Sequence, residues 1–261
     1  MKNNPVLDCL MKRSSVRIFT EEPLSEEEEN IILEAAMRAP TAAKLQLYSI
    51  IVVRDKETKA KLAETCNHQP WLAKTPFLLI FCADYQRVYD FYDGSGAREK
   101  AEKLGIEYVR PGEQYLLLAT VDASIAAENA VIAGESIGVG SCFVGHIMDY
   151  YEIHKEMFNL PDYVYPISIL AMGHTGTKAS KPSPRCPREF IVHEEKYRRF
   201  SPDELDSCYS FFPEPPVPNR FDAENRGQYH FLSRHSSSGC YQEGIRSVRE
   251  ALKNWDYGKQ D

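Results

Sequence analysis

The chain of 261 residues is 43% hydrophobic and 26% charged, the composition of an ordinary soluble globular protein. Its formal net charge of −7, and the absence of any apolar run near ~20 residues, argue against nucleic-acid binding and membrane insertion. The N-terminal residues lack a signal-peptide core, and the seven cysteines contain no CxxC pair, which favours reduced thiols. We therefore expect a cytoplasmic protein with neither a nucleic-acid nor a membrane partner.

The predicted elements begin with a short helix near 4–10, followed by the basic, hydroxyl-bearing segment MKRSSVRIF. Ser25 and Glu28 form a capping box, so a second helix begins there, and it stops before Pro40. The elements expected next are an irregular segment at 40–47, a strand at 48–53, a helix at 55–65 and a strand at 77–83. The charged stretch 84–111 resembles an insertion, with one expected helix at 97–104 that Gly105 ends.

Residues 113–136 predict one long central helix. At about 3.6 residues per turn its polar residues form two thin stripes, one with Asp122, Asn129 and Ser136 and the other with Glu128 and Glu135. Both sectors between the stripes are apolar, so the helix is expected to be buried on two sides, one of them against the chain's own core. Its small alanines favour a closely approaching helix as the other cover, such as the same helix of a second subunit. A central helix within a monomer is the alternative.

The elements expected after this helix are a strand at 141–144, a helix at 151–160, a strand at 165–172 closed by Gly173, a loop at 175–187, a short helix capped by Ser201 and Glu204, an extended arm or mobile loop at 213–239 and a last helix near 241–255. Strands interleaved with helices around a buried helix indicate an α+β or α/β domain of three layers.

The common catalytic motifs are missing: the sequence has no Walker loop, no GxGxxG after the first strand, no HExxH and no GxSxG. We therefore expect no metal site, and an organic cofactor is the remaining route to chemistry. The segment Arg13-Ser14-Ser15-Val16-Arg17 suits a phosphate monoester, because guanidinium groups make charge-assisted, bidentate bonds to phosphate oxygens. A solvated basic turn is the alternative for this segment taken alone.

Further segments supply the other parts of a binding site. Lys181-Pro-Ser-Pro-Arg185 is a second cationic loop, stiffened by prolines. The segment 39–46 offers small residues beside which a planar ring fits, and 143–145 places backbone amides at a strand end. In their order and spacing, RSSVRIF, APTAAKLQ, HQPW, SIGVGSCFVG, KPSPRCP and IVHEEKY resemble the nitroreductase-like flavoenzymes, in particular the oxygen-insensitive NADPH nitroreductase and flavin reductase group.

This resemblance implies an α+β, nitroreductase-like three-layer fold, in which helices flank a central mixed sheet and the long helix lies at the interface of a homodimer. It implies an FMN-binding domain over residues 1–200 and a C-terminal extension over 201–261 that packs on the domain or on the partner subunit. FMN is the implied cofactor, bound without covalent attachment, with NADPH or NADH as the electron donor.

The resemblance also implies roles by matching position. Arg13, Ser14 and Ser15 would hold the FMN phosphate together with Arg185, and Arg17 would lie near the pyrimidine edge of the flavin. The remaining residues implied at the flavin are Gln69 beside the ribityl chain, Pro40, Thr41, Ala42, Ala43 and Gln46 from the partner subunit, and Val144, Gly145 and His146 near the ring. Arg234, in a mobile loop, would contact the 2′-phosphate of NADPH.

Three positions depart from the family pattern. Lys44 stands where asparagine is common, His146 stands where a second glycine is usual, and Ser183 replaces a lysine for which Lys181 is the substitute. These departures bear on ring geometry and substrate shape.

The implied reaction is a ping-pong hydride transfer from NADPH through FMN to a nitroaromatic, a quinone or a free flavin, with no side chain assigned as catalytic. Three alternatives stay open. The first is a different flavin reaction such as dehalogenation or ring cleavage, with 84–111 as a lid, and the second is a non-catalytic role in sensing or storing FMN. The third is a scaffold or interaction module without flavin, in which the basic loops are solvated surface.

Overall fold

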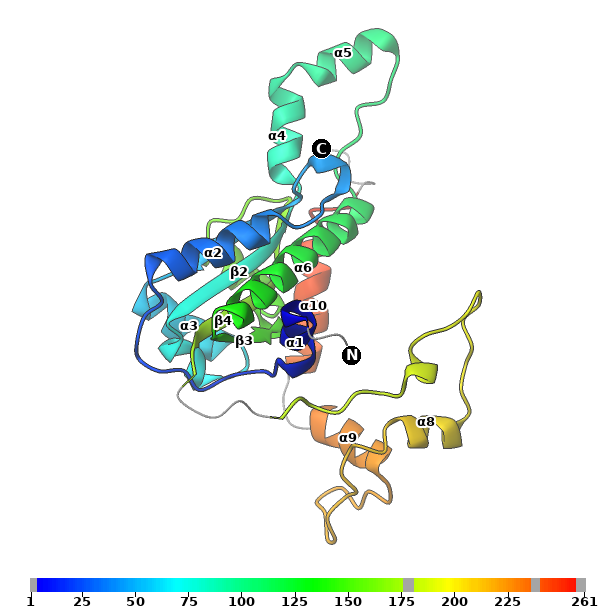
Figure 1. Cartoon of the computed structure of the whole chain (residues 1–261). Coiled ribbons are helices and arrows are strands. Elements are labelled where there is room, and N and C mark those ends of the chain that lie inside the picture. Colours follow the sequence, from blue (N-terminus) through cyan, green and yellow to red (C-terminus); the bar gives the residue numbers. More distant parts are fainter. Residues whose placement is uncertain (1–3, 176–180, 236–239, 257–261) are drawn as a thin grey trace. The chain divides into compact units, whose positions relative to one another are not determined.

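The computed structural model describes residues 4–175, 181–235 and 240–256 (Figure 1). The chain divides into two compact units, residues 1–181 with 242–261 and residues 182–241. From residue 242 onward the last helix therefore belongs to the same unit as the sheet. The division at residue 200, into an FMN-binding domain and an extension, stays a prediction.

The first unit is built on a four-stranded sheet in the order β1-β2-β4-β3. Its strands are β1 (Tyr48–Val53), β2 (Phe77–Asp84), β3 (Val139–Val144) and β4 (Val164–His174). All three pairings between these strands are antiparallel, and the parallel pairing among the described bridges is the single pair Ser15–Ser141. The α+β class is confirmed, but the sheet is antiparallel within this chain rather than mixed.

Strand β2 is buried along its whole length, which explains its unbroken apolar sequence FLLIFCA. Because successive side chains of a strand point to opposite faces, Leu79 and Phe81 join one core cluster while Leu78 and Ile80 join another. Helices α2 (Glu26–Met37) and α6 (Glu113–Ser136) cover the first face, as Figure 1 shows. Helix α3 (Lys56–Thr65) and the 3₁₀ turn η2 (Pro70–Lys74) cover the second. This is the expected three-layer arrangement.

The central helix α6 has the predicted bounds, but its alanines face the chain's own core. Ala119, Ala123, Ala126 and Ala130 are fully buried, whereas Leu117 and Val121 are 68% and 53% exposed. The alanine sector is therefore not the uncovered one: small side chains let α6 approach the sheet and α2 closely. By length and composition alone α6 could cross a membrane, a test that the core helix of a soluble protein also passes.

The N-terminal segment runs along the edge of the sheet after helix α1 (Pro5–Lys12). Val16 N donates to Ser141 O at 2.8 Å, and a Cβ at Gly140 would lie 2.8 Å from the Val16 side chain. Gly173 plays a similar part, since a Cβ there would lie 3.0 Å from the Phe19 ring. The prediction that Gly173 closes the last strand is wrong: β4 runs through it to His174, and the glycine serves close packing.

The insertion holds two helices rather than one, α4 (Gln86–Gly94) and the predicted α5 (Ala97–Leu104), which stand away from the sheet in Figure 1. The other elements of this unit are the 3₁₀ turns η1 (Ala42–Lys44) and η3 (Gly145–Met148) and the helices α7 (Tyr151–Met157) and α10 (Cys240–Leu252), of which α10 begins in the second unit.

The second unit contains η4 (Arg188–Phe190), α8 (Pro202–Cys208) and α9 (Arg226–His235). The capping box of Ser201 with Glu204 begins α8 as predicted. The prediction of an extended arm or mobile loop over 213–239 is wrong for its second half, because 226–235 is helical. Residues 236–239 lie outside the described part of the chain.

Candidate functional site

The segment 13–17 combines buried and exposed polar groups beside β3. Ser14 is buried, Ser15 and Arg17 are exposed, and Arg13 is half-buried where α1 ends. The Nε atom of Arg13 is buried and has no hydrogen-bond partner in the protein. Since a buried donor without an acceptor is costly, this atom marks a place where a ligand with acceptor oxygens fits.

Three residues that the sequence analysis did not assign to the site lie around this segment. Burial raises the pKa of Glu135, on the last turn of α6, and the charge of Arg13 opposes that rise. One carboxylate oxygen of Glu135 and the hydroxyl of Ser141 are buried without partners. Burial also raises the pKa of the Cys142 thiol, against the charges of Arg17 and Arg13. Arg13 therefore lies near α6 and β3, in a cluster in which Arg13 Nε, Glu135 Oε1 and Ser141 Oγ lack partners.

The loop 41–47 is organised by the buried carboxylate of Asp122, on α6. Asp122 accepts hydrogen bonds from the Thr41 hydroxyl, from Ala42 N at 3.1 Å and from Leu47 N at 3.2 Å. One stripe residue predicted from the helix pattern thus has a specific task. Asn129, one stripe position further along, donates to Ala35 O at 3.1 Å and fastens α2.

The same loop has a strained backbone. Ala43, Lys44 and Gln46 have φ values of 49°, 63° and 49°, in the left-handed region that L-residues rarely occupy. Gln46 N donates to the Thr41 hydroxyl at 2.8 Å, and Arg87 of α4 donates to the Gln46 carbonyl. Such strain persists only where the surroundings fix it, and it is concentrated at functional sites.

The two polar regions lie far apart on one chain. The 41–47 loop is fixed to α6 at Asp122, whereas 13–17 meets α6 near Glu135, more than three turns further on. At ~1.5 Å per residue that separation is about 20 Å along the helix.

The end of β3 supplies the next group of predicted residues. Val144 is buried, Gly145 is exposed, and the half-exposed His146 ring bonds through Nδ1 to Asp149 at 2.8 Å. Gln69 is half-buried, and its side-chain amide donates to Cys66 O at 2.8 Å.

The remaining predicted residues are three exposed cations, Lys181, Arg185 and Arg234, and the exposed Pro40. Lys181 is at the end of the first unit, and Arg185, in the second, bonds to the carbonyls of Ser183 and Pro184 at 2.9 and 3.1 Å. Pro40 is exposed just before the 41–47 loop. Arg234 lies on the last turn of α9, so the prediction that it sits in a mobile loop is wrong.

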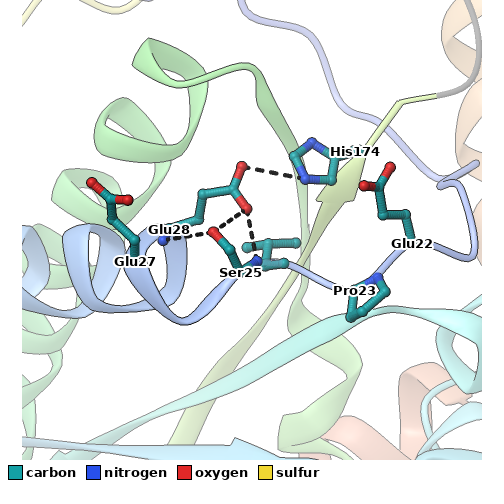
Figure 2. A pocket seen from close by; sticks show the side chains of 7 residues that line it. Glu22, Pro23, Ser25, Glu27, Glu28 and His174 are labelled. Atoms are coloured by element: carbon teal, nitrogen blue, oxygen red, sulfur yellow. Dashed lines mark hydrogen bonds and ion pairs between the residues drawn. The ribbon is translucent and has the colours of Figure 1, made fainter.

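A surface hollow elsewhere has the opposite charge (Figure 2). It is lined by Glu22, Glu27 and Glu28 together with His174, which lies 3.3 Å from the Glu28 carboxylate. Hydrogen bonds from Ser25 hold the pKa of Glu28 below its usual value. Carboxylates repel a phosphate, so this hollow is unsuited to FMN. Among the described residues, no group of three His, Cys, Asp or Glu side chains is arranged to hold a metal.

Comparison with known proteins bears on this arrangement. The family model described as "Nitroreductase family" matches residues 10–174. An "FMN reductase [NAD(P)H]" of Bacillus subtilis is 35% identical over 211 residues, 81% of each chain. An "FMN reductase (NADPH)" of the same organism is 34% identical over 194 residues, 74% of this chain and 75% of that one. The solved structure of the hypothetical oxidoreductase YcnD from Bacillus subtilis superposes with a TM-score of 0.77 at 29% identity, over 99% of this chain and 100% of that one.

Proposed function

Because this chain belongs to the nitroreductase family, we propose that it is an FMN-dependent oxidoreductase with NAD(P)H as its electron donor. The observation that carries the proposal is the buried, unpartnered Arg13 Nε beside the hydroxyl-bearing segment at β3. A phosphate monoester offers the acceptor oxygen that the Arg13 Nε–H group requires. Two relatives of similar length are named for reducing FMN with NAD(P)H or NADPH, which supports the same conclusion.

In this proposal each residue group has one task. Arg13, Ser14 and Ser15 bind the phosphate, and the Arg17 cation stabilises negative charge at the pyrimidine edge of the ring. The residues that complete the cofactor site are Gln69, Val144, Gly145, His146, Lys181 and Arg185. When bound, FMN would supply the redox chemistry, a ping-pong hydride transfer from the nicotinamide to a second substrate, while these residues hold and orient it. The proposed acceptors are nitroaromatics, quinones and free flavin.

A homodimer completes the site in this proposal. The 40–46 loop is about 20 Å along α6 from the phosphate-binding segment of its own chain, so we assign Pro40, Thr41, Ala42, Ala43 and Gln46 to the flavin bound by the other subunit. Exposed apolar residues support such an interface: Leu117 and Val121 on α6, and Val6, Leu10 and Met11 on α1. Exposed large apolar side chains on both helices are what an interface between subunits would cover.

We propose that the protein prefers NADPH over NADH because of one exposed cation. Arg234 presents a guanidinium on the last turn of α9, which suits a 2′-phosphate. Arg234→Ala would then raise the KM for NADPH and leave that for NADH unchanged.

The first test is an absorbance spectrum of the purified protein, before and after anaerobic addition of NADPH and, separately, NADH. We expect a flavin spectrum that bleaches with either donor, and light scattering at twice the chain mass. No bound flavin after reconstitution with FMN would contradict the proposal. Flavin that is bound but not bleached would favour the storage or sensing role, whereas bleaching followed by slow turnover of nitroaromatics and fast turnover of a haloaromatic would favour dehalogenation.

A further inference from the structure

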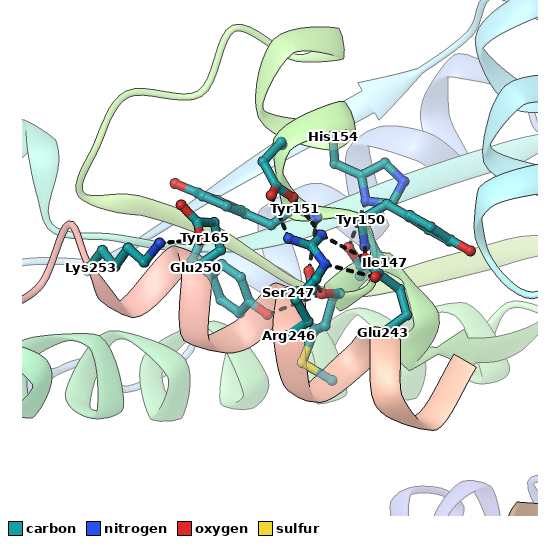
Figure 3. Close-up of polar contacts among 12 residues, drawn as sticks. Ile147, Tyr150, Tyr151, His154, Tyr165, Glu243, Arg246, Ser247, Glu250 and Lys253 are labelled. Atoms are coloured by element: carbon teal, nitrogen blue, oxygen red, sulfur yellow. Dashed lines mark hydrogen bonds and ion pairs between the residues drawn. The ribbon is translucent and has the colours of Figure 1, made fainter. Parts of the chain in front are cut away.

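Backbone groups of the turn after β3 form hydrogen bonds with side chains from α7, α10 and β4. Residues 145–151 connect the strand end to α7, and Tyr150 adopts a φ of 51°, a strained value for a bulky residue. His154 of α7 bonds to Ile147 O at 2.8 Å, and the Tyr165 hydroxyl of β4 donates to Met148 O at 3.4 Å. Figure 3 shows these groups gathered beside α10.

Side chains of helix α10 form hydrogen bonds with the backbone at and on both sides of the strained residue Tyr150. The Ser247 side chain is fully buried; its hydroxyl donates to Met148 O at 2.6 Å and accepts from Tyr151 N at 2.8 Å. The Glu243 carboxylate accepts from Tyr150 N at 3.2 Å. Two side chains of α10 thus bond to three backbone groups of the stretch 148–151, and one of these groups, Met148 O, is shared with Tyr165 of β4.

Arg246 fixes Glu243 in place. Its guanidinium bonds to both oxygens of Glu152 on α7, at 2.6 and 2.8 Å. It also bonds to both oxygens of Glu243, at 2.8 and 2.7 Å (Figure 3). These bonds lower the pKa of Glu152 to about 2 and hold the pKa of Glu243 below its usual value. Glu243 is therefore a carboxylate at neutral pH, which is the better acceptor for the Tyr150 amide.

Gly244 brings α10 against the Asp149 carboxylate. A Cβ at Gly244 would lie 2.9 Å from one Asp149 oxygen, while the other oxygen binds His146 Nδ1 at 2.8 Å. Asp149 is buried, so it has little room to move. The position of α10 is therefore transmitted through Asp149 to the His146 ring, the residue directly after Gly145.

We propose that α10 is a positioning element of the cofactor site: Glu243, Gly244 and Ser247 set the Gly145–Tyr150 turn and the His146–Asp149 pair against the flavin ring. This inference rests on the proposed FMN site. If the protein did not bind FMN, the same contacts would only attach the C-terminal helix to the turn after β3.

Matched variants separate positioning from simple attachment. Glu243→Gln keeps an oxygen acceptor for Tyr150 N, whereas Glu243→Ala leaves that amide unpaired. We expect Glu243→Ala and Ser247→Ala to raise the FMN dissociation constant about tenfold, and Glu243→Gln to restore most of the loss. Glu250→Ala is the control, because it removes only the Lys253 ion pair from the same helix.

Gly244→Ala keeps the test decisive if a truncated variant fails to fold. Alanine favours a helix more than glycine does, so α10 should persist, but its Cβ must displace Asp149 and with it His146. We expect an altered visible circular dichroism spectrum and a shifted reduction potential of the bound flavin, in a variant whose apoprotein still unfolds cooperatively in urea. Wild-type affinity, dichroism and potential in Ser247→Ala and Gly244→Ala would overturn the inference. Failure of the wild type itself to bind FMN would instead overturn the proposed function.

Discussion

The two polar regions along α6 are held in opposite ways. The 41–47 loop is held by hydrogen bonds within the protein. The buried Asp122 carboxylate accepts three of them from the loop, whose backbone is strained. The 13–17 segment is anchored through its backbone to β3, while the buried atoms Arg13 Nε, Glu135 Oε1 and Ser141 Oγ lack partners. One region is preorganised by the protein, and the other leaves a buried donor, Arg13 Nε, for a ligand.

This difference indicates how the two regions divide the work of binding. A surface that packs against a planar ring must keep its shape without the ligand, so it benefits from internal hydrogen bonds. A phosphate-binding segment needs free donors, and leaving them unpaired lowers the stability of the protein without its ligand. Four variants test the comparison, from the largest expected effect to the smallest.

Asp122→Ala removes the acceptor that organises the 41–47 loop. Three donors lose their partner, so we expect the free energy of unfolding to fall by about 3 kcal/mol in urea denaturation of the apoprotein. Ser124→Ala is the control, because that exposed hydroxyl bonds only to Thr120 O within α6. Equal stability of the two variants would show that Asp122 does not organise the loop.

Arg13→Ala should act on the ligand more than on the fold. We expect the dissociation constant for FMN, measured by flavin fluorescence, to rise about 10- to 100-fold, with little loss of apoprotein stability. Lys12→Ala is the control, since Lys12 is an exposed neighbour paired with Asp8 within α1. A large loss of apoprotein stability with unchanged FMN affinity would reverse the contrast between the two regions.

Gly140→Ala tests the close packing of the 13–17 segment against β3. The new Cβ would lie 2.8 Å from the Val16 side chain, so we expect a loss of about 1–3 kcal/mol in thermal or urea unfolding. Val16→Ala in the same chain should recover most of the loss, because the two changes are coupled. Gly94→Ala, whose Cβ meets no atom within 4 Å, is the matched control. An additive double variant would exclude direct packing of Val16 on Gly140.

Glu135→Gln should give the smallest effect, visible as a pH dependence. Burial raises the pKa of Glu135 in the folded state, so the folded protein binds this proton more tightly than the unfolded chain does. Wild-type stability therefore falls as pH rises from the ordinary carboxyl pKa of ~4.3 through the raised pKa of Glu135 in the folded state, and the glutamine variant lacks this loss. We expect the apoprotein variant to be slightly more stable than wild type at pH 7, and we expect the gap between their free energies of unfolding to close at pH 4. A gap that widens on acidification would contradict this assignment.

Local signals in the sequence predicted much of the fold. The capping boxes at Ser25 and Ser201 begin helices as expected, and the strand 48–53 and the helices 97–104 and 113–136 have the predicted bounds. Helices α4 and α9 were missed: both lie in stretches read as polar or irregular, where helix propensity is weak and packing decides. The roles of individual site residues stay predictions.

By itself the sequence determined the family, the α+β class and the cationic segment 13–17, because caps, periodicity and motif order depend on residues near one another in the chain. Only the tertiary structure decided which side of α6 is covered, why Gly140 and Gly173 are needed, and what Asp122, Glu135 and Ser247 do. These roles arise between residues far apart in the chain, from 75 positions for Leu47 and Asp122 to 154 for Phe19 and Gly173. A close approach or an unpaired buried atom exists only once distant segments are packed together, and local patterns do not encode that packing.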